Sequence, residues 1–165
     1  MEIQGLPAHP LLVHGPVVLI PLVALLSIVL VLKRPWRTTV GPWLVLLAFI
    51  TFALTFLAAQ SGEELQANVR DTELVRHHAQ LGGALRPIAL AQLIAILMLI
   101  APAWAHARGG PGVLVRLAAS KPWSIISVVL VVVMSVLATY WVIQTGHSGA
   151  DAVWHNVHLV NPAKD

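Results

Sequence analysis

Hydrophobic residues along this chain fall into four long runs that are separated by shorter polar segments. The runs cover residues 11–32, 41–59, 87–105 and 123–145, and none has a charged residue in its interior. A helix needs about 20 apolar residues to cross a bilayer, and a helix on a soluble surface would show a polar face with a period of 3.6 residues. The pattern therefore predicts an all-α integral membrane four-helix bundle that occupies residues 1–165 as a single domain.

Composition narrows the classes of protein that fit this pattern. Hydrophobic residues make up 58% of the 165 residues and charged residues only 10%, whereas soluble domains carry about 25% charged residues. The net charge of +3 is spread among apolar runs and forms no basic face, so no nucleic-acid partner is expected. The chain has no cysteine, which excludes disulfides, thiolate metal sites, iron–sulfur clusters and covalently attached haem.

The charged residues predict how the helices are oriented in the bilayer. The segments 33–40 and 106–122 carry basic residues and no acid, whereas every acid lies in a terminal segment or in the segment 60–86. Loops rich in lysine and arginine stay on the cytoplasmic side. We therefore expect a multi-pass protein of the plasma (inner) membrane with both termini extracytoplasmic and these basic residues inside: Lys33, Arg34, Arg37, Arg108, Arg116 and Lys121.

A short repeat follows the second and fourth runs. Ser61-Gly62 and Ser148-Gly149 each have an acid three residues after the serine, at Glu64 and Asp151. One interpretation is a capping box that starts a new helix at each serine, which predicts short amphipathic surface helices on the outer side. The repeat also suggests two helical hairpins related by a pseudo-twofold axis along the membrane normal.

Histidine outnumbers the acids, eight to seven, and is concentrated on one side. Under the predicted topology, His106 is the one histidine on the cytoplasmic side. His14 lies within a predicted membrane helix, where its ring needs a polar partner. If the carboxyl-terminal segment is helical, His147, Asp151 and His155 share one face, which is either a metal-binding stripe or a solvated surface. The outer histidines are His9, His14, His77, His78, His147, His155 and His158.

These histidines suggest a redox or metal-binding role. Haem b could be held inside the bundle by His14 together with His78 or His147, and Arg86 could pair with a haem propionate or with Glu63 or Glu64. The alternative cofactor is copper or zinc, with a ligand set drawn from His9, His14, His147, Asp151 and His155 and with Asp151 orienting one ring.

Other functions remain open at this stage. The alternative is a non-catalytic membrane subunit or scaffold that binds no cofactor and in which the histidines are structural. A homo-oligomer is also considered. Transport ranks last because no charge lies within the four spans. No Gly-x-Ser-x-Gly or His-Glu-x-x-His motif occurs, so we expect an electron-transfer or metal-binding protein rather than a stand-alone enzyme.

The two ends of the chain resemble a known family. The segment Gly5-Leu6-Pro7-Ala8-His9-Pro10 with Val13-His14-Gly15-Pro16, and the later Gly146-His147-Ser148-Gly149 with Val153-Trp154-His155, are similar to the opening and closing motifs of the uncharacterised membrane-protein family called domain of unknown function 2231. The resemblance spans the whole chain and implies four helices. Some members are fused to Rieske iron–sulfur domains, which implies a membrane redox partner such as a Rieske or quinol-linked protein.

Overall fold

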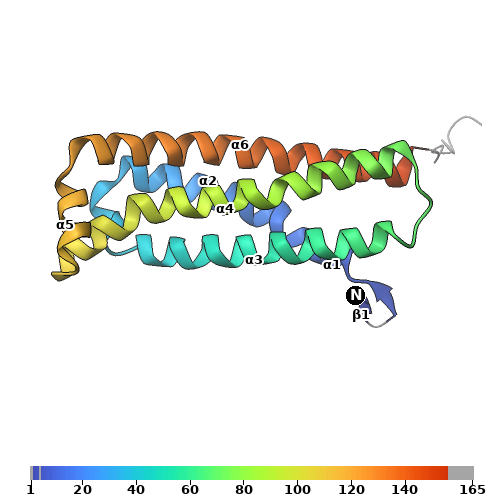
Figure 1. Ribbon diagram of the computed structural model, residues 1–165, viewed down its shortest axis with the longest axis horizontal. Helices are drawn as coiled ribbons and strands as arrows, with labels where there is room; N and C mark the ends of the chain where they lie inside the picture. The colour runs from blue at the N-terminus through green and yellow to red at the C-terminus, as the bar shows by residue number, and fades with distance from the viewer. Residues whose placement is uncertain (1, 4, 156–165) are drawn as a thin grey trace, which may run out of the picture.

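The computed structural model describes residues 2–3 and 5–155 and shows a bundle of four long helices (Figure 1). A short β-hairpin precedes the bundle. Its two strands, β1 (Glu2–Ile3) and β2 (Leu6–Pro7), have two residues each. The four long helices form two helical hairpins. The connection within the first contains η1 (Arg34–Arg37), and the connection within the second contains α5 (Gly112–Ala119). The helices of the bundle are α1 (His9–Leu12), α2 (His14–Leu32), α3 (Gly41–Gln66), α4 (Glu73–Arg108) and α6 (Lys121–Trp154).

The helices close into a ring of four around an apolar core. Helix α2 packs against α3 and α6, and α4 packs against the same two helices, so that α2 lies diagonally opposite α4. The core includes Val23, Leu44, Ile96 and Val131, one from each helix. Four helical segments are long and apolar enough to cross a membrane, which confirms the predicted all-α four-helix membrane bundle.

Three helices extend well beyond the apolar runs at the end that holds the amino terminus. Helix α3 continues to Gln66, α4 already begins at Glu73, and α6 continues to Trp154. The predicted capping boxes are therefore wrong, because Ser61 and Ser148 lie inside α3 and α6. Each hydroxyl donates to the carbonyl three residues earlier, which lets a serine stay within a helix. Separate surface helices at these serines do not form.

The first span is interrupted where proline predicts it. Pro16 has no amide hydrogen to donate to the carbonyl four residues earlier, and the helix is broken at Val13, between α1 and α2. Val13 still donates its amide to the carbonyl of His9. The short α1 is thereby set off from α2, and it packs against α3.

Arg37 closes the carboxyl end of α2. Its Nε donates to the carbonyl of Leu30 and its Nη2 to that of Val31, both at 2.9 Å, and carbonyls at the end of a helix have no partner within the helix. Burial lowers the pKa of this guanidinium, and the charge of Arg34 lowers it further, yet arginine remains protonated in proteins. Arg37 is therefore a structural cap of α2.

The two hairpins are equivalent in their buried positions. A shift of 69 positions carries every buried residue of α2 onto a buried residue of α4; for example, Ile20 goes to Ala89 and Leu30 to Leu99. A shift of 87 positions does the same for five of the seven buried residues of α3 onto α6, such as Leu44 to Val131. The structure thus supports the pseudo-twofold repeat that the serine–glycine motif suggests.

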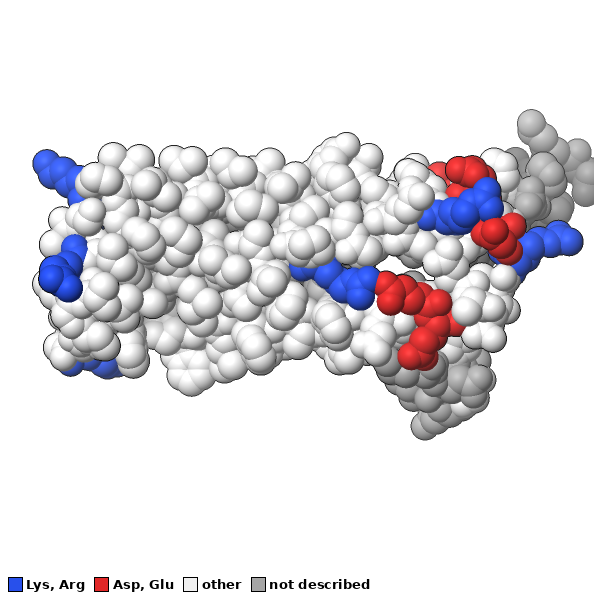
Figure 2. Space-filling view, in the orientation of Figure 1, with Lys and Arg blue, Asp and Glu red and all other residues white. Residues whose placement is uncertain are grey.

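On the face shown, the stretch between the α5 end and the middle of the bundle carries no charged side chain (Figure 2). On the face shown, the end formed by α5 carries only lysine and arginine, whereas acids appear only at the opposite end. Large apolar side chains such as Leu25, Phe49 and Val133 are exposed between the ends. This arrangement suits a bilayer around the middle of the bundle.

Candidate functional site

The first half of the candidate site is a seat for His9 on the end of α3. The ring Nδ1 of His9 lies 2.9 Å from the carbonyl oxygen of Ala58. The hydroxyl of Ser61 donates to the same carbonyl at 2.9 Å and lies 3.5 Å from Nδ1. A carbonyl only accepts hydrogen bonds, so Nδ1 must carry the hydrogen. In the neutral ring, the lone pair is therefore on Nε2.

The second half repeats this arrangement in the other hairpin. The Nδ1 of His78, on α4, lies 3.1 Å from the carbonyl oxygen of Thr145 and 3.1 Å from the hydroxyl of Ser148, both on α6. Ser148 donates to Thr145 as Ser61 does to Ala58. The shifts of 69 and 87 positions carry His9, Ala58 and Ser61 onto these three residues.

Glycine makes room for each ring. A Cβ added to Gly62 would lie 2.9 Å from Cε1 of His9, and one added to Gly149 would lie 3.0 Å from Cε1 of His78. A side chain at position 62 would therefore displace the ring of His9, and one at position 149 would push the ring of His78 by a few tenths of an ångström. The Ser-Gly pairs of the repeat are therefore seats for histidine, and we call each set of histidine, serine and glycine a histidine seat.

The two histidine seats meet at the end of the bundle that holds the amino terminus. The rings of His9 and His78 lie edge to face, with centroids 6.0 Å apart and planes inclined by 69°. Both rings are half-buried, and their contact joins the two hairpins. Nitrogen ligands bind an ion such as zinc at about 2.0–2.1 Å, so two ligating nitrogens lie about 4 Å apart at most. For comparison, the centroids of the His9 and His78 rings are 6.0 Å apart.

The other predicted ligands lie apart from this pair. His14 begins α2 with an exposed side chain, and no hydrogen bond, ion pair or ring contact joins it to the rest of the described chain. His147 and Asp151 are exposed on α6, with Nε2 and Oδ2 3.8 Å apart. His155 is exposed just after α6, and His158 lies outside the described residues. Across residues 2–3 and 5–155, no group of three or more potential ligands is arranged to hold a metal.

Arg86 makes one of the two pairings expected of it. Its guanidinium forms an ion pair with Glu63 and lies 5.9 Å from the centroid of the Phe56 ring. This ion pair joins α4 to α3 and is a second link between the hairpins at the same end of the bundle. With Arg86 engaged in this way, the arrangement offers no separate support for its pairing with a haem propionate.

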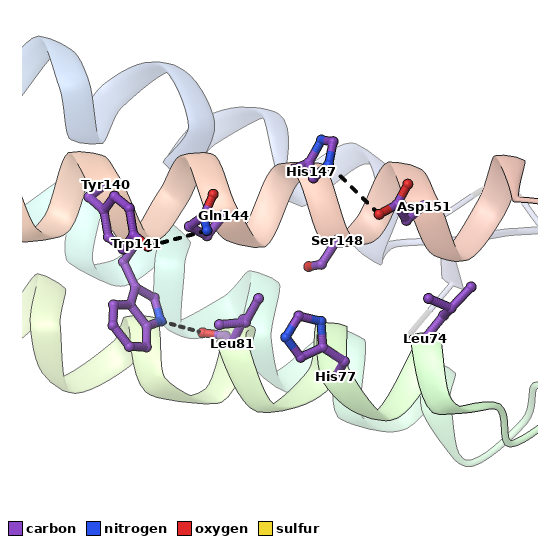
Figure 3. Close-up of a pocket in the computed structure, with 9 residues that line it drawn as sticks. All are labelled: Leu74, His77, Leu81, Tyr140, Trp141, Gln144, His147, Ser148 and Asp151. Atoms are coloured by element: carbon purple, nitrogen blue, oxygen red, sulfur yellow. Dashed lines mark hydrogen bonds and ion pairs between the residues drawn. The ribbon is translucent and has the colours of Figure 1, made fainter.

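A pocket of about 180 Å³ opens beside the second histidine seat, between α4 and α6 (Figure 3). Trp141 forms one wall, and its indole Nε1 donates to the carbonyl of Leu81 at 3.2 Å. Gln144 Nε2 donates to the hydroxyl of Tyr140 at 3.3 Å. His77 contributes from α4, and Ser148 belongs both to this pocket and to the seat of His78.

The sequence identifies the histidines as candidate site residues but does not predict that His9 pairs with His78. Sequence reasoning placed His9 in a metal set and His78 in a haem set, and it interpreted the serines as helix caps. The missing signal is the spacing between each histidine and its Ser-Gly pair, which differs between the hairpins because α5 lengthens the second connection. The sequence motifs do not predict the pocket.

The fold and the site together define a four-span α-helical membrane protein that is built of two equivalent hairpins. The end of the bundle that holds the amino terminus carries the paired rings of His9 and His78. The family model described as "Predicted membrane protein (DUF2231)" matches residues 5–161. The chain therefore belongs to this family, which confirms the resemblance of its terminal motifs. No curated protein and no solved structure matches the chain.

Proposed function

We propose that this protein binds a metal centre through His9 and His78 at the outer end of the bundle and works in membrane electron transfer. The centre is haem b or, in the close variant, a copper ion; a zinc ion on the same rings would be structural, because Zn²⁺ has no redox chemistry. The observation that carries the proposal is that each ring gives its Nδ1 hydrogen to a main-chain carbonyl. Histidines that ligate metals are held through their other ring nitrogen in this way, and both Nε2 atoms are left as donors to a metal.

The chemistry of the donor set fits such a centre. Two neutral imidazoles suit haem iron, copper or zinc, and the absence of cysteine from the sequence makes non-covalent haem the form that fits. When bound, haem or copper would supply a one-electron carrier. The residues of this chain would fix the tautomer, hold the rings through the serines, and exclude water with the surrounding apolar helices.

A substitution that keeps the hydrogen bond made by Nδ1 but removes Nε2 tests the proposal. Asparagine places an amide donor near the position of Nδ1 but has no counterpart of Nε2. We expect the purified wild type, expressed with ample haem and metal, to show a Soret band or a bound metal. His9→Asn and His78→Asn should fold and lose it. His106→Asn, at the inner end of α4, is the matched control and should keep it.

The result that contradicts the proposal is equally definite. If the wild type shows no Soret band and elemental analysis finds no copper, zinc or iron, it has no metal centre. The histidine seats are then structural, and the protein is a non-catalytic membrane subunit or scaffold. The observation that favours this second candidate is that hydrogen bonds and close glycine contacts already occupy both rings.

We also propose that the paired histidines face the outside of the plasma membrane, where a redox partner would dock. The distribution of charge supports this orientation, because the loop ends with η1 and α5 are basic and the opposite end carries the acids. Alkaline phosphatase fused after Asp165 should be active, and the same enzyme inserted at Gly110 should be inactive. Activity only at Gly110 would reverse the orientation.

A further inference from the structure

The pocket between α4 and α6 has polar and aromatic walls at the edge of an apolar span. Its volume of about 180 Å³ is less than that of a pocket for a drug-sized ligand, so it has room for one small headgroup. Figure 3 shows aromatic side chains toward one end and the imidazole and carboxylate groups toward the other. The residues that matter for recognition are His77, Tyr140, Trp141, Gln144, His147 and Asp151.

The equivalent hairpin shows that folding does not require these side chains. The shift of 87 positions relates Tyr140, Trp141 and Gln144 to Ala53, Leu54 and Leu57, and the shift of 69 relates His77 to Ala8. The first hairpin packs with small or aliphatic residues at all these positions. The equivalent helices thus form without counterparts of Tyr140, Trp141, Gln144 and His77, whereas His147 and Asp151 have polar counterparts, Gln60 and Glu64. The aromatic and amide groups that are found only in the second hairpin point to a ligand as their purpose.

The pocket directly adjoins the seat of His78. Ser148 lines the pocket, and its hydroxyl lies 3.1 Å from Nδ1 of His78. A headgroup in the pocket would therefore lie one side chain away from a ring that we propose as a metal ligand. This proximity suits a molecule that exchanges electrons with the centre.

The surface next to the pocket suits a ligand with an apolar tail. Exposed apolar residues continue along α6 from the pocket toward the inner end, at the helical spacing of Tyr140, Val136, Val133 and Val129. These side chains lie on the face of α6 that the bilayer covers. A tail could follow this stripe while the headgroup occupies the pocket.

We propose that this pocket binds the headgroup of an isoprenoid quinone or quinol. A flat ring would stack against Trp141, and its oxygens would meet the donors and acceptors of Gln144, His77 and the His147–Asp151 pair, whose Nε2 and Oδ2 atoms lie 3.8 Å apart. The assignment of this ligand as the electron-exchange partner of the centre rests on the proposed function. Binding of the headgroup itself does not require the metal.

The test compares quinone binding by matched variants of the full-length protein in nanodiscs. Decylubiquinone and menadione are titrated, and binding is followed by quenching of tryptophan fluorescence and by calorimetry. Trp141→Leu and Gln144→Leu give the second hairpin the residues of the first, so they should fold. Each should weaken binding at least tenfold in calorimetry. Gln60→Ala, the counterpart of a change at His147, should bind as the wild type does.

The outcomes separate this inference from the proposed function. His78→Asn without metal should still bind quinone, and Trp141→Leu should keep its metal. Absence of quinone binding by the wild type would overturn the inference even if a metal is present. So would equal binding by Trp141→Leu, by Gln144→Leu and by the wild type. A co-purified phospholipid that quinone cannot displace would also overturn it.

Discussion

His9 and His78 lie edge to face with ring centroids 6.0 Å apart, and each belongs to a different hairpin of the bundle. The pseudo-twofold axis passes between them, because the shift that relates α2 to α4 carries one histidine onto the other. Their contact is therefore a link between equivalent halves of the chain. A perturbation of either histidine seat should be felt at the other.

The glycine of a histidine seat should not tolerate a side chain. In Gly149→Ala the new Cβ would lie 3.0 Å from Cε1 of His78, and forcing extra atoms into a packed site costs about 1–3 kcal/mol. We expect a lower melting temperature and loss of any bound centre. Gly146→Ala, on the same helix with nothing within 4 Å of its Cβ, is the control. It should gain up to about 1 kcal/mol from helix propensity.

The serines should contribute equally in the two hairpins. Ser61→Ala and Ser148→Ala each remove a hydroxyl that bonds the seat's carbonyl and lies near its ring. One such hydrogen bond is worth about 1 kcal/mol, so both variants should lose that amount in denaturant unfolding. A large loss in one variant and none in the other would contradict the equivalence of the seats.

Removing the Arg37 side chain should destabilise the carboxyl end of α2. Arg37→Ala leaves the carbonyls of Leu30 and Val31 without their donors, and hydrogen bonds to charged groups contribute about 1.5–3 kcal/mol each. We expect a loss of about 3 kcal/mol in unfolding free energy, the lower end of the range for two such bonds. Arg34→Ala removes an exposed charge from the same loop and should change stability by less than about 0.5 kcal/mol.

The Arg86–Glu63 ion pair should give a small coupling between the hairpins. The side chains are 27% and 57% exposed, and solvent screening limits exposed pairs to about 0.2–1 kcal/mol. A double-mutant cycle with Arg86→Ala and Glu63→Gln should give a coupling energy in this range that falls as salt is added. Additive single effects at low salt would show that the pair adds nothing.

The sequence predicts the membrane bundle well because each apolar run is long enough to cross a bilayer. It cannot show where the helices end outside the membrane, since α3, α4 and α6 continue through polar residues such as Gln60, His78 and His147. Helix length there depends on packing against neighbouring helices, which periodicity does not report. Sequence reasoning therefore treated Ser61 and Ser148 as the start of new helices.

The candidate site shows the same limit. The histidines stand out by composition, but a ring–ring contact between α1 and α4 requires knowing which helices are diagonal. His14 attracted attention because it lies within an apolar run, yet its side chain is exposed. The pocket was missed because Trp141 and Tyr140 are also typical of membrane interfaces. Only the comparison with Leu54 and Ala53 distinguishes them.

The shared burial pattern of the hairpins has a consequence for how such a protein could have arisen. One hairpin with its own histidine, serine and glycine would present half of the site, and a second copy related by a twofold axis would complete it. Symmetric dimers place identical residues around their axis in this way. Once the two copies are joined in one chain, each half can change its sequence independently. The difference between Leu54 and Trp141, which occupy equivalent positions, is the kind of divergence that this allows.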